Sequence, residues 1–388
     1  MLESYHHVGH SVPKRDGWAK LNADPIFAAD IDMGSPLILK ALRSTRPHAT
    51  IRSINIQPAL AVPGVDRVFT AEDIPGKNLF GIINKDHPLL AEDKVRSTGD
   101  AVALVAAESE EAAAAAVQAI EVDYSDLEAV FDPQKALDPS APLIHTKGNL
   151  LFSRHIERGD VHKALAQSDV VIENTYTTPR LEHTYLEPDA GCGFVDDDGS
   201  LVIYASTQNP HYDHKEVVEM LNVPEDNVRI IQAATGGGFG SKLDLNVQGF
   251  IGLALYHLRL PVRYVYTREE AFRATAKRHP LTIEVITGAD AQGNLQAAKV
   301  TITCDTGAYG SYGIAVASRA AVHAVGPYEV DNVLIDSRCV YTNSPFCGAM
   351  RGFGAPQAAI AHEGQMDLLA QALDMDPLRI REINALRP

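Results

Sequence analysis

Short apolar runs separated by turn residues fill the first 130 positions of the chain. Residues 29–51 contain strand-like pieces, and residues 100–109, 110–120 and 119–127 have the patterns of a strand, an alanine-rich helix and a strand. Residues 131–149 then carry three prolines and little periodicity. The pattern predicts a small unit at 1–130, a linker at 131–149 and a second unit from residue 150.

The second unit, residues 150–388, mixes both kinds of periodicity. Its last two helical patterns cover 356–375 and 376–387, and the second begins with Asp376 as N-cap and Pro377 at the first helical position. Strand and helix patterns together predict a mixed α+β fold. The other expected elements are strands at 169–188, 200–207 and 227–234, helices at 214–223 and 246–258, and a hairpin at 281–309 that turns at 290–294.

Composition narrows the class of protein. The chain has 388 residues, of which 45% are apolar and 22% charged, and a formal charge of -16. An acidic chain of this kind disfavours nucleic acid and anionic membrane as partners. Its four cysteines show no CxxC spacing, so we expect neither a disulfide framework nor an iron–sulfur cluster held by this chain. No signal-peptide core and no membrane-length apolar run occurs, which predicts a cytoplasmic protein.

The stretch TGGGFGSKLD, residues 235–244, is almost free of side chains at its start. It lies between a predicted strand and a predicted helix, where backbone amides often bind anions. A phosphate-binding GxxxxGK[ST] loop is excluded because Lys242 follows Ser241, and a GxGxxG fingerprint is excluded because Ser241 occupies its last position. A tight turn without any ligand remains the alternative.

A second run, AMRGFGAPQAA at 349–359, has the same character and also precedes a predicted helix. Arg351 lies within it and can donate two parallel hydrogen bonds to an anion or to a ring edge. Gln208, in ASTQNPH after a predicted strand, offers both a donor and an acceptor. Two glycine–phenylalanine loops that each lead into a helix predict one large flat or anionic ligand between the helix N-termini.

The segments ASTQNP, GGGFGSK and RGFGAPQ, in this order and at these separations, resemble the molybdopterin-binding subunit of the xanthine dehydrogenase/aldehyde oxidase family. The similarity extends over nearly the whole chain and is greatest to the bacterial nicotinate dehydrogenase branch. It implies an N-terminal α/β hammerhead domain at 1–130, followed after the linker by the first molybdopterin-binding domain at 150–388.

The resemblance also implies roles for single residues. Phe353 is expected to stack on an aromatic substrate, and Arg319 falls where purine hydroxylases have a substrate-facing arginine. Leu243 falls where those enzymes have a glutamate, which disfavours xanthine as substrate. The cofactor contacts that the resemblance implies are Gln208, Gly238, Phe239, Gly240, Arg351 and Gly352, with no residue of this chain bound directly to the metal.

A substrate that carries a carboxylate suits these differences. Leu243 removes a charge that would repel such a substrate, and Arg319 remains to pair with it. If residues 311–320 are helical, Tyr312 and Arg319 are seven positions apart and share a face. The alternatives are a salt bridge for Arg319 and simple packing for Tyr312.

The catalytic base of the family is a glutamate from a second molybdopterin-binding domain, and no GxGE segment occurs in this sequence. We therefore expect no catalytic residue in this chain and a second molybdopterin subunit that supplies the base, with a shortened form of a longer protein as the alternative. The implied reaction hydroxylates an N-heteroaromatic ring with water as the oxygen source, converting nicotinate to 6-hydroxynicotinate. Other readings are a purine, an aldehyde or another azaarene as substrate, or a non-catalytic scaffold half.

The implied cofactor is molybdopterin with molybdenum, in its cytosine dinucleotide form, whose further ligand is either sulfido or selenido. Electrons would leave through [2Fe–2S] clusters and FAD on an iron–sulfur subunit and an FAD subunit. Two other clusters have simpler interpretations. Asp213 in HYDH is expected to cap a helix, and Glu182, His183 and Glu187 are expected to form polar packing near the cofactor.

Overall fold

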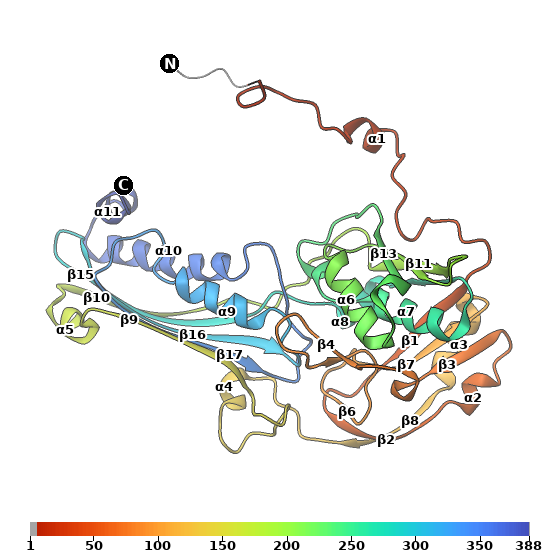
Figure 1. The fold of residues 1–388 in the computed structure, drawn as a ribbon. Helices are drawn as coiled ribbons and strands as arrows, with labels where there is room; N and C mark the ends of the chain where they lie inside the picture. Colours follow the sequence, from red (N-terminus) through yellow and green to blue (C-terminus); the bar gives the residue numbers. More distant parts are fainter. Residues whose placement is uncertain (1–5, 388) are drawn as a thin grey trace.

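In this computed structural model, which describes residues 6–387, a seven-stranded sheet joins strands from residues 37–107 with strands from residues 190–265 (Figure 1). Its order is β13-β12-β11-β14-β1-β7-β3, and β1 runs parallel to β14 with Leu37 opposite Val262. Strands from before and after residues 131–149 therefore lie in one sheet. Its strands are β1 (Leu37–Arg43), β3 (Val65–Phe69), β7 (Ala101–Ala107), β11 (Ala190–Val195), β12 (Leu201–Ala205), β13 (Val228–Gln232) and β14 (Val262–Val265).

A five-stranded sheet of order β10-β15-β16-β17-β9 forms the other half of the molecule. Helices α9 (Gly313–Val322) and α10 (Ala355–Ala372) lie along one face of it, and α11 (Pro377–Asn384) packs on α10 (Figure 1). The predicted hairpin is confirmed as β15 and β16, which pair antiparallel. The strands are β9 (Leu150–Arg158), β10 (Val170–Thr177), β15 (Leu281–Ala289), β16 (Leu295–Gly307) and β17 (Asn332–Tyr341).

Smaller elements complete the two halves. Helices α6 (Pro210–Leu221) and α7 (Val247–Leu258) pack together on the seven-stranded sheet, and α3 (Glu110–Ala119) covers β1 and β7. The remaining strands are β2 (Ala49–Asn55), β6 (Lys94–Val95) and β8 (Glu121–Asp126) in one sheet, and β4 (Leu79–Phe80) and β5 (His87–Pro88) in another; the short helices are α1 (Gly17–Leu21), α2 (Gln57–Leu60), α4 (Pro133–Ala136), α5 (Val161–Gln167) and α8 (Arg268–Ala274).

Each sheet has its own apolar core. Leu104, Ile203 and Ile251 are fully buried against the seven-stranded sheet, whereas Ile302 and Leu369 are fully buried against the five-stranded one. Burial of so many aliphatic side chains is the main favourable contribution to folding. No helix within residues 6–387 has the length and apolarity that crossing a membrane requires.

Two local predictions differ from the structure and one agrees. Asp376 caps α11 as predicted, accepting hydrogen bonds from the backbone of Leu378 and Arg379. The expected strand at 169–188 ends at Thr177, since Pro179 follows closely and cannot donate to a strand ladder. Asp213 does not cap α6; it lies inside the helix and is buried.

Candidate functional site

The glycine loop, residues 235–240, follows β13 and has an unusual backbone. Gly237, Phe239 and Gly240 have φ angles of 100°, 52° and 111°, a region that side chains other than glycine rarely adopt. The loop continues into a short 3-10 helix at Ser241–Leu243, and α7 begins only at Val247. The prediction that the loop leads toward a helix at 246–258 is therefore confirmed, with the 3-10 helix between them.

A buried ion pair supports the glycine loop. One carboxylate oxygen of Glu187 accepts hydrogen bonds from the Gly236 N–H at 2.7 Å, from the Ser206 hydroxyl at 2.7 Å and from the Lys242 ammonium at 2.9 Å. The Lys242 side chain has no exposed surface, and its ammonium lies 4.7 Å from the centre of the Tyr185 ring. The polar packing expected for Glu187 is thus confirmed, and its partner is the loop itself.

The second loop, residues 349–354, contacts the first. The Arg351 N–H donates to the Phe239 carbonyl at 3.0 Å, and a Cβ atom on Gly240 would lie 2.5 Å from the Ala349 carbonyl oxygen. Only glycine permits that approach. Gly354, with a φ of 98°, is the N-cap of α10, so this loop does open into a helix as predicted.

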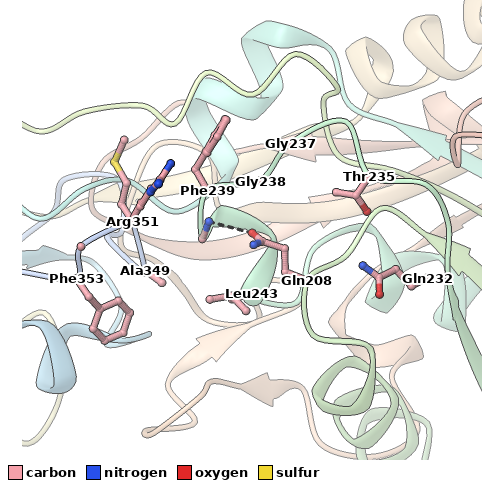
Figure 2. A pocket seen from close by; sticks show the side chains of 13 residues that line it. Gln208, Gln232, Thr235, Gly237, Gly238, Phe239, Leu243, Ala349, Arg351 and Phe353 are labelled. Atoms are coloured by element: carbon pink, nitrogen blue, oxygen red, sulfur yellow. Dashed lines mark hydrogen bonds between the residues drawn. The ribbon is translucent and has the colours of Figure 1, made fainter. Parts of the chain in front are cut away.

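Gln208 lies between β12 and α6 and points toward the glycine loop (Figure 2). Its side-chain oxygen accepts a hydrogen bond from the Gly240 N–H at 2.9 Å. A Cβ atom on Gly238 would lie only 2.4 Å from the same oxygen. The absence of a side chain at Gly238 therefore makes room for Gln208.

These segments surround a cavity of about 610 Å³ (Figure 2). Arg351 is the only charged side chain that lines it, and no acidic side chain of residues 6–387 does so. Eight residues singled out from the sequence line the cavity: Gln208, Gly238, Phe239, Gly240, Leu243, Arg351, Gly352 and Phe353. Five that the sequence did not single out also line it: Gln232, Thr235, Gly237, Ala349 and Met350.

Several backbone donors at this cavity are available. Among residues 6–387, no group accepts a hydrogen bond from the N–H groups of Gly238, Phe239 or Gly352. Backbone N–H groups in turns of this kind bind anionic oxygen atoms well. Together with Arg351, they give the cavity the character of an anion-binding site.

Tyr312 and Arg319 lie outside the cavity lining but meet at Phe353. The Tyr312 and Phe353 rings pack edge to face with centres 5.3 Å apart, and the Arg319 guanidinium lies 5.8 Å from the Phe353 ring centre. Tyr312 directly precedes α9 and is not part of the helix, so the predicted shared helix face does not apply. Arg319 forms no ion pair with any residue in 6–387.

Two carboxyl groups, the half-buried Asp86 and the buried Asp244, hold the turn that leads to Tyr312. Asp86 accepts a hydrogen bond from the Gly310 N–H at 3.0 Å, and Asp244 accepts one from the Ser311 hydroxyl at 2.7 Å. Burial raises the pKa of Asp86 to about 6 and that of Asp244 to about 7. The sequence did not reveal this arrangement, because Asp86 stands in no recognisable motif and Asp244, the last residue of TGGGFGSKLD, finds its partner 67 residues along the chain.

Two family profiles match the chain. Residues 22–128 match the a/b hammerhead domain of aldehyde oxidase and xanthine dehydrogenase. Residues 144–385 match the molybdopterin cofactor-binding domain.

Individual proteins are similar over nearly the full length of this chain. This chain is 49% identical to the nicotinate dehydrogenase large molybdopterin subunit of Eubacterium barkeri, and the match covers 99% of this chain and 91% of that protein. It is 34% identical to the xanthine dehydrogenase molybdenum-binding subunit of Escherichia coli O157:H7, covering 96% of this chain and 51% of that one.

Solved structures share the fold. The aldehyde oxidoreductase of Desulfovibrio gigas superposes with a TM-score of 0.93 at 30% identity, covering 97% of this chain and 43% of that chain. Quinoline 2-oxidoreductase of Pseudomonas putida 86 superposes with a TM-score of 0.91 at 28% identity, covering 98% of this chain and 50% of that chain. The chain thus spans most of one relative and about half or less of the others.

Proposed function

Because the chain belongs to the xanthine dehydrogenase/aldehyde oxidase family, we propose that it is the molybdopterin subunit of a hydroxylase that converts nicotinate to 6-hydroxynicotinate. The relative with 49% identity is named for nicotinate, and the chain covers 91% of it, which supports this substrate. The observation that carries the proposal is the group formed by Arg319, Tyr312 and Phe353 beside a cavity that no acidic side chain in the described part of the chain lines.

The residues of the cavity fit molybdopterin. The available N–H groups of Gly238, Phe239 and Gly352 and the Arg351 guanidinium would hold its anionic and polar edges, and Gln208 would hydrogen-bond close to the metal. When bound, the cofactor would supply the two-electron oxidation in which water provides the oxygen atom. We propose the cytosine dinucleotide form, since the resemblance to nicotinate dehydrogenase implies it.

In the reaction, the role of this chain would be to orient the substrate. Phe353 would stack on the pyridine ring, while Arg319 and Tyr312 would bind the carboxylate by a charge-assisted fork and one hydrogen bond. Leu243 adds apolar surface without a negative charge. Holding the ring in one orientation lowers the entropic part of the barrier.

We propose that a second molybdopterin subunit supplies the catalytic glutamate, as the family resemblance implies. An iron–sulfur subunit with [2Fe–2S] clusters and a subunit with FAD would remove the electrons, in the cytoplasm. The similarity to a protein described as one subunit of nicotinate dehydrogenase supports such a complex.

The proposal is tested on the tagged chain purified with its companions from the native host. We expect molybdenum and iron in the preparation and turnover of nicotinate far above that of nicotinamide, which has the same shape without the charge. Arg319→Lys should raise KM for nicotinate at least ten-fold, because lysine lacks the planar fork. Arg379→Lys, at an exposed position on α11, is the control.

Other outcomes identify the alternatives. Preferred turnover of xanthine, quinoline or an aldehyde would keep the family and replace the substrate. An unchanged KM in Arg319→Lys would remove the carboxylate-binding role. Absence of molybdenum from the purified complex would leave a non-catalytic scaffold half.

A further inference from the structure

Residues 6–24 form an arm that extends away from the rest of the molecule (Figure 1). It contains the five-residue helix α1, none of whose residues is buried. Large apolar side chains are nevertheless spread along it: Val8 is 71% exposed, Val12 56%, Trp18 76% and Leu21 78%. Apolar side chains concentrated on one exposed segment are typical of a surface that another molecule covers.

The arm begins at the glycine loop. The Ala234 N–H donates to the Ile26 carbonyl at 3.3 Å, and Phe27 forms a parallel bridge with Ala234, the second residue after the end of β13. The Phe27 ring lies 3.5 Å from the position that a Cβ atom on Gly236 would occupy. The point from which the arm departs is therefore fixed to the rim of the cavity.

Exposed apolar side chains also surround that departure point. We call Ile26, Leu186 and Phe239 the glycine-loop face; they are 61%, 91% and 49% exposed. Leu186 directly precedes Glu187, whose N–H and carboxylate both bind Gly236. A polypeptide that covers this face would meet the base of the arm, so the arm and the face form one continuous surface.

The charged side chains of the arm indicate which groups a binding partner should carry. Lys14 and Arg15 make no ion pair with any residue in 6–387, and Lys20 pairs only with Asp16, one turn earlier in the arm. Residues 6–24 carry three cations and two acidic residues, in a chain of net charge -16. Two unpaired cations between apolar side chains fit a surface with apolar pockets and acidic side chains beside them.

We propose that residues 6–24 clasp the second molybdopterin subunit, which would cover the glycine-loop face, with Trp18 and Leu21 as apolar anchors and Lys14 and Arg15 paired with its acidic groups. This inference rests on the proposed function in one respect, namely that a second subunit completes the site. Aromatic anchors at the centre of an interface contribute most of its binding energy.

The tagged full-length chain is purified from the native host as wild type, as Trp18→Ala/Leu21→Ala and as Lys14→Glu/Arg15→Glu. We expect each arm variant to retain at most a tenth of the second molybdopterin subunit that the wild type retains. The thermal midpoint of each variant should equal that of the wild type, because α1 contains no buried residue. The matched control is Leu60→Ala with Lys135→Glu, on α2 and α4 on the far side of the molecule from the arm (Figure 1).

Trp18 is the only tryptophan in the chain, so 5-fluorotryptophan labels one site. Its single 19F resonance should move, and should lose its sensitivity to exchange of H2O for D2O, when unlabelled companion subunits are added. The same change in the chain alone, dependent on its concentration, would show that a second copy is the occupant and would overturn the proposal.

The failures are distinguishable. If both arm variants retain the companion subunits in full, the inference about the arm is overturned and the proposed function stays intact. A wild-type preparation with neither companions nor molybdenum overturns the proposed function, and the arm inference with it.

Discussion

Phe239 and Phe353 occupy equivalent places in the two glycine loops and share a strained backbone, with φ of 52° and 57°. A residue other than glycine in this region costs about 1–3 kcal/mol and persists only where its surroundings hold it there. Here the hydrogen bond between the Arg351 N–H and the Phe239 carbonyl joins the two loops, and the Phe353 N–H donates to Met350. Because both loops contain the same strained backbone, we infer that Phe239 and Phe353 are held in this conformation for the function of the site.

At the same scale, Gly238→Ala should lower the free energy of unfolding by about 1–3 kcal/mol, the usual cost of overpacking. The added Cβ would lie 2.4 Å from the Gln208 oxygen and displace it from the Gly240 N–H. Chemical denaturation of the purified chain measures the loss, and metal analysis should show less bound molybdenum.

The double variant Gln208→Ala/Gly238→Ala is the control, since it removes the atom with which the Cβ collides. It should recover most of the stability but not the molybdenum content. If stability stays low in the double variant, the cost comes from the backbone and not from Gln208.

Among the elements, the loop at 178–189 shows where sequence patterns stop being informative. The periodicity continues the strand to residue 188, but the chain leaves the sheet after Thr177 so that Tyr185 and Glu187 can support the glycine loop. Nothing local indicates that Lys242, beside glycines and serine, is fully buried and paired with Glu187. Such a pairing depends on the tertiary fold.

Elements with a strong apolar period were predictable. The helices at 246–258 and 356–375 correspond to α7 and α10, and the hairpin at 281–309 to β15 and β16. The family resemblance and the order of hammerhead and molybdopterin-binding domains are confirmed by the matched profiles. Motifs also pointed to eight residues of the cavity lining. The sequence predicts that Tyr312 and Arg319 share a helix face if residues 311–320 are helical. In the structure, each of them instead lies against the Phe353 ring.

Lys242→Met should destabilise the element that carries the site. It keeps the length of the side chain but leaves the buried Glu187 carboxylate without its cation, which typically costs about 3–5 kcal/mol. Urea denaturation should show this loss, whereas Arg158→Met, which breaks the exposed Arg158–Asp331 pair, should cost less than about 1 kcal/mol. Equal losses in the two variants would contradict the anchoring role of Lys242.

For the whole molecule, buried carboxyl groups link stability to pH. Asp213 is fully buried, and one of its oxygens accepts hydrogen bonds from Thr207 at 2.5 Å and Gln248 at 3.1 Å. Burial raises its pKa to about 8, with a smaller contribution from the nearby Asp244. The folded state therefore binds a proton that the unfolded state releases between about pH 4 and 8, so stability falls as pH rises through this range.

Asp213→Asn should flatten that dependence. The unfolding free energy of the wild type relative to the variant should fall by up to about 1.4 kcal/mol per pH unit between pH 5 and 8. Urea midpoints at four pH values measure it, with the exposed Asp226→Asn as the matched control. A pH-independent difference would mean that Asp213 stays ionised when folded.

The mixed order of the seven-stranded sheet has a consequence for synthesis. Leu37 pairs with Val262, and β11, β12 and β13 extend the sheet beyond β14. On the ribosome, β1 emerges long before β14, so one edge of β1 stays unpaired while most of the chain is still being made. An unpaired strand edge is a template for association with other chains. The interval between the emergence of β1 and of β14 is therefore when a nascent chain most needs a chaperone.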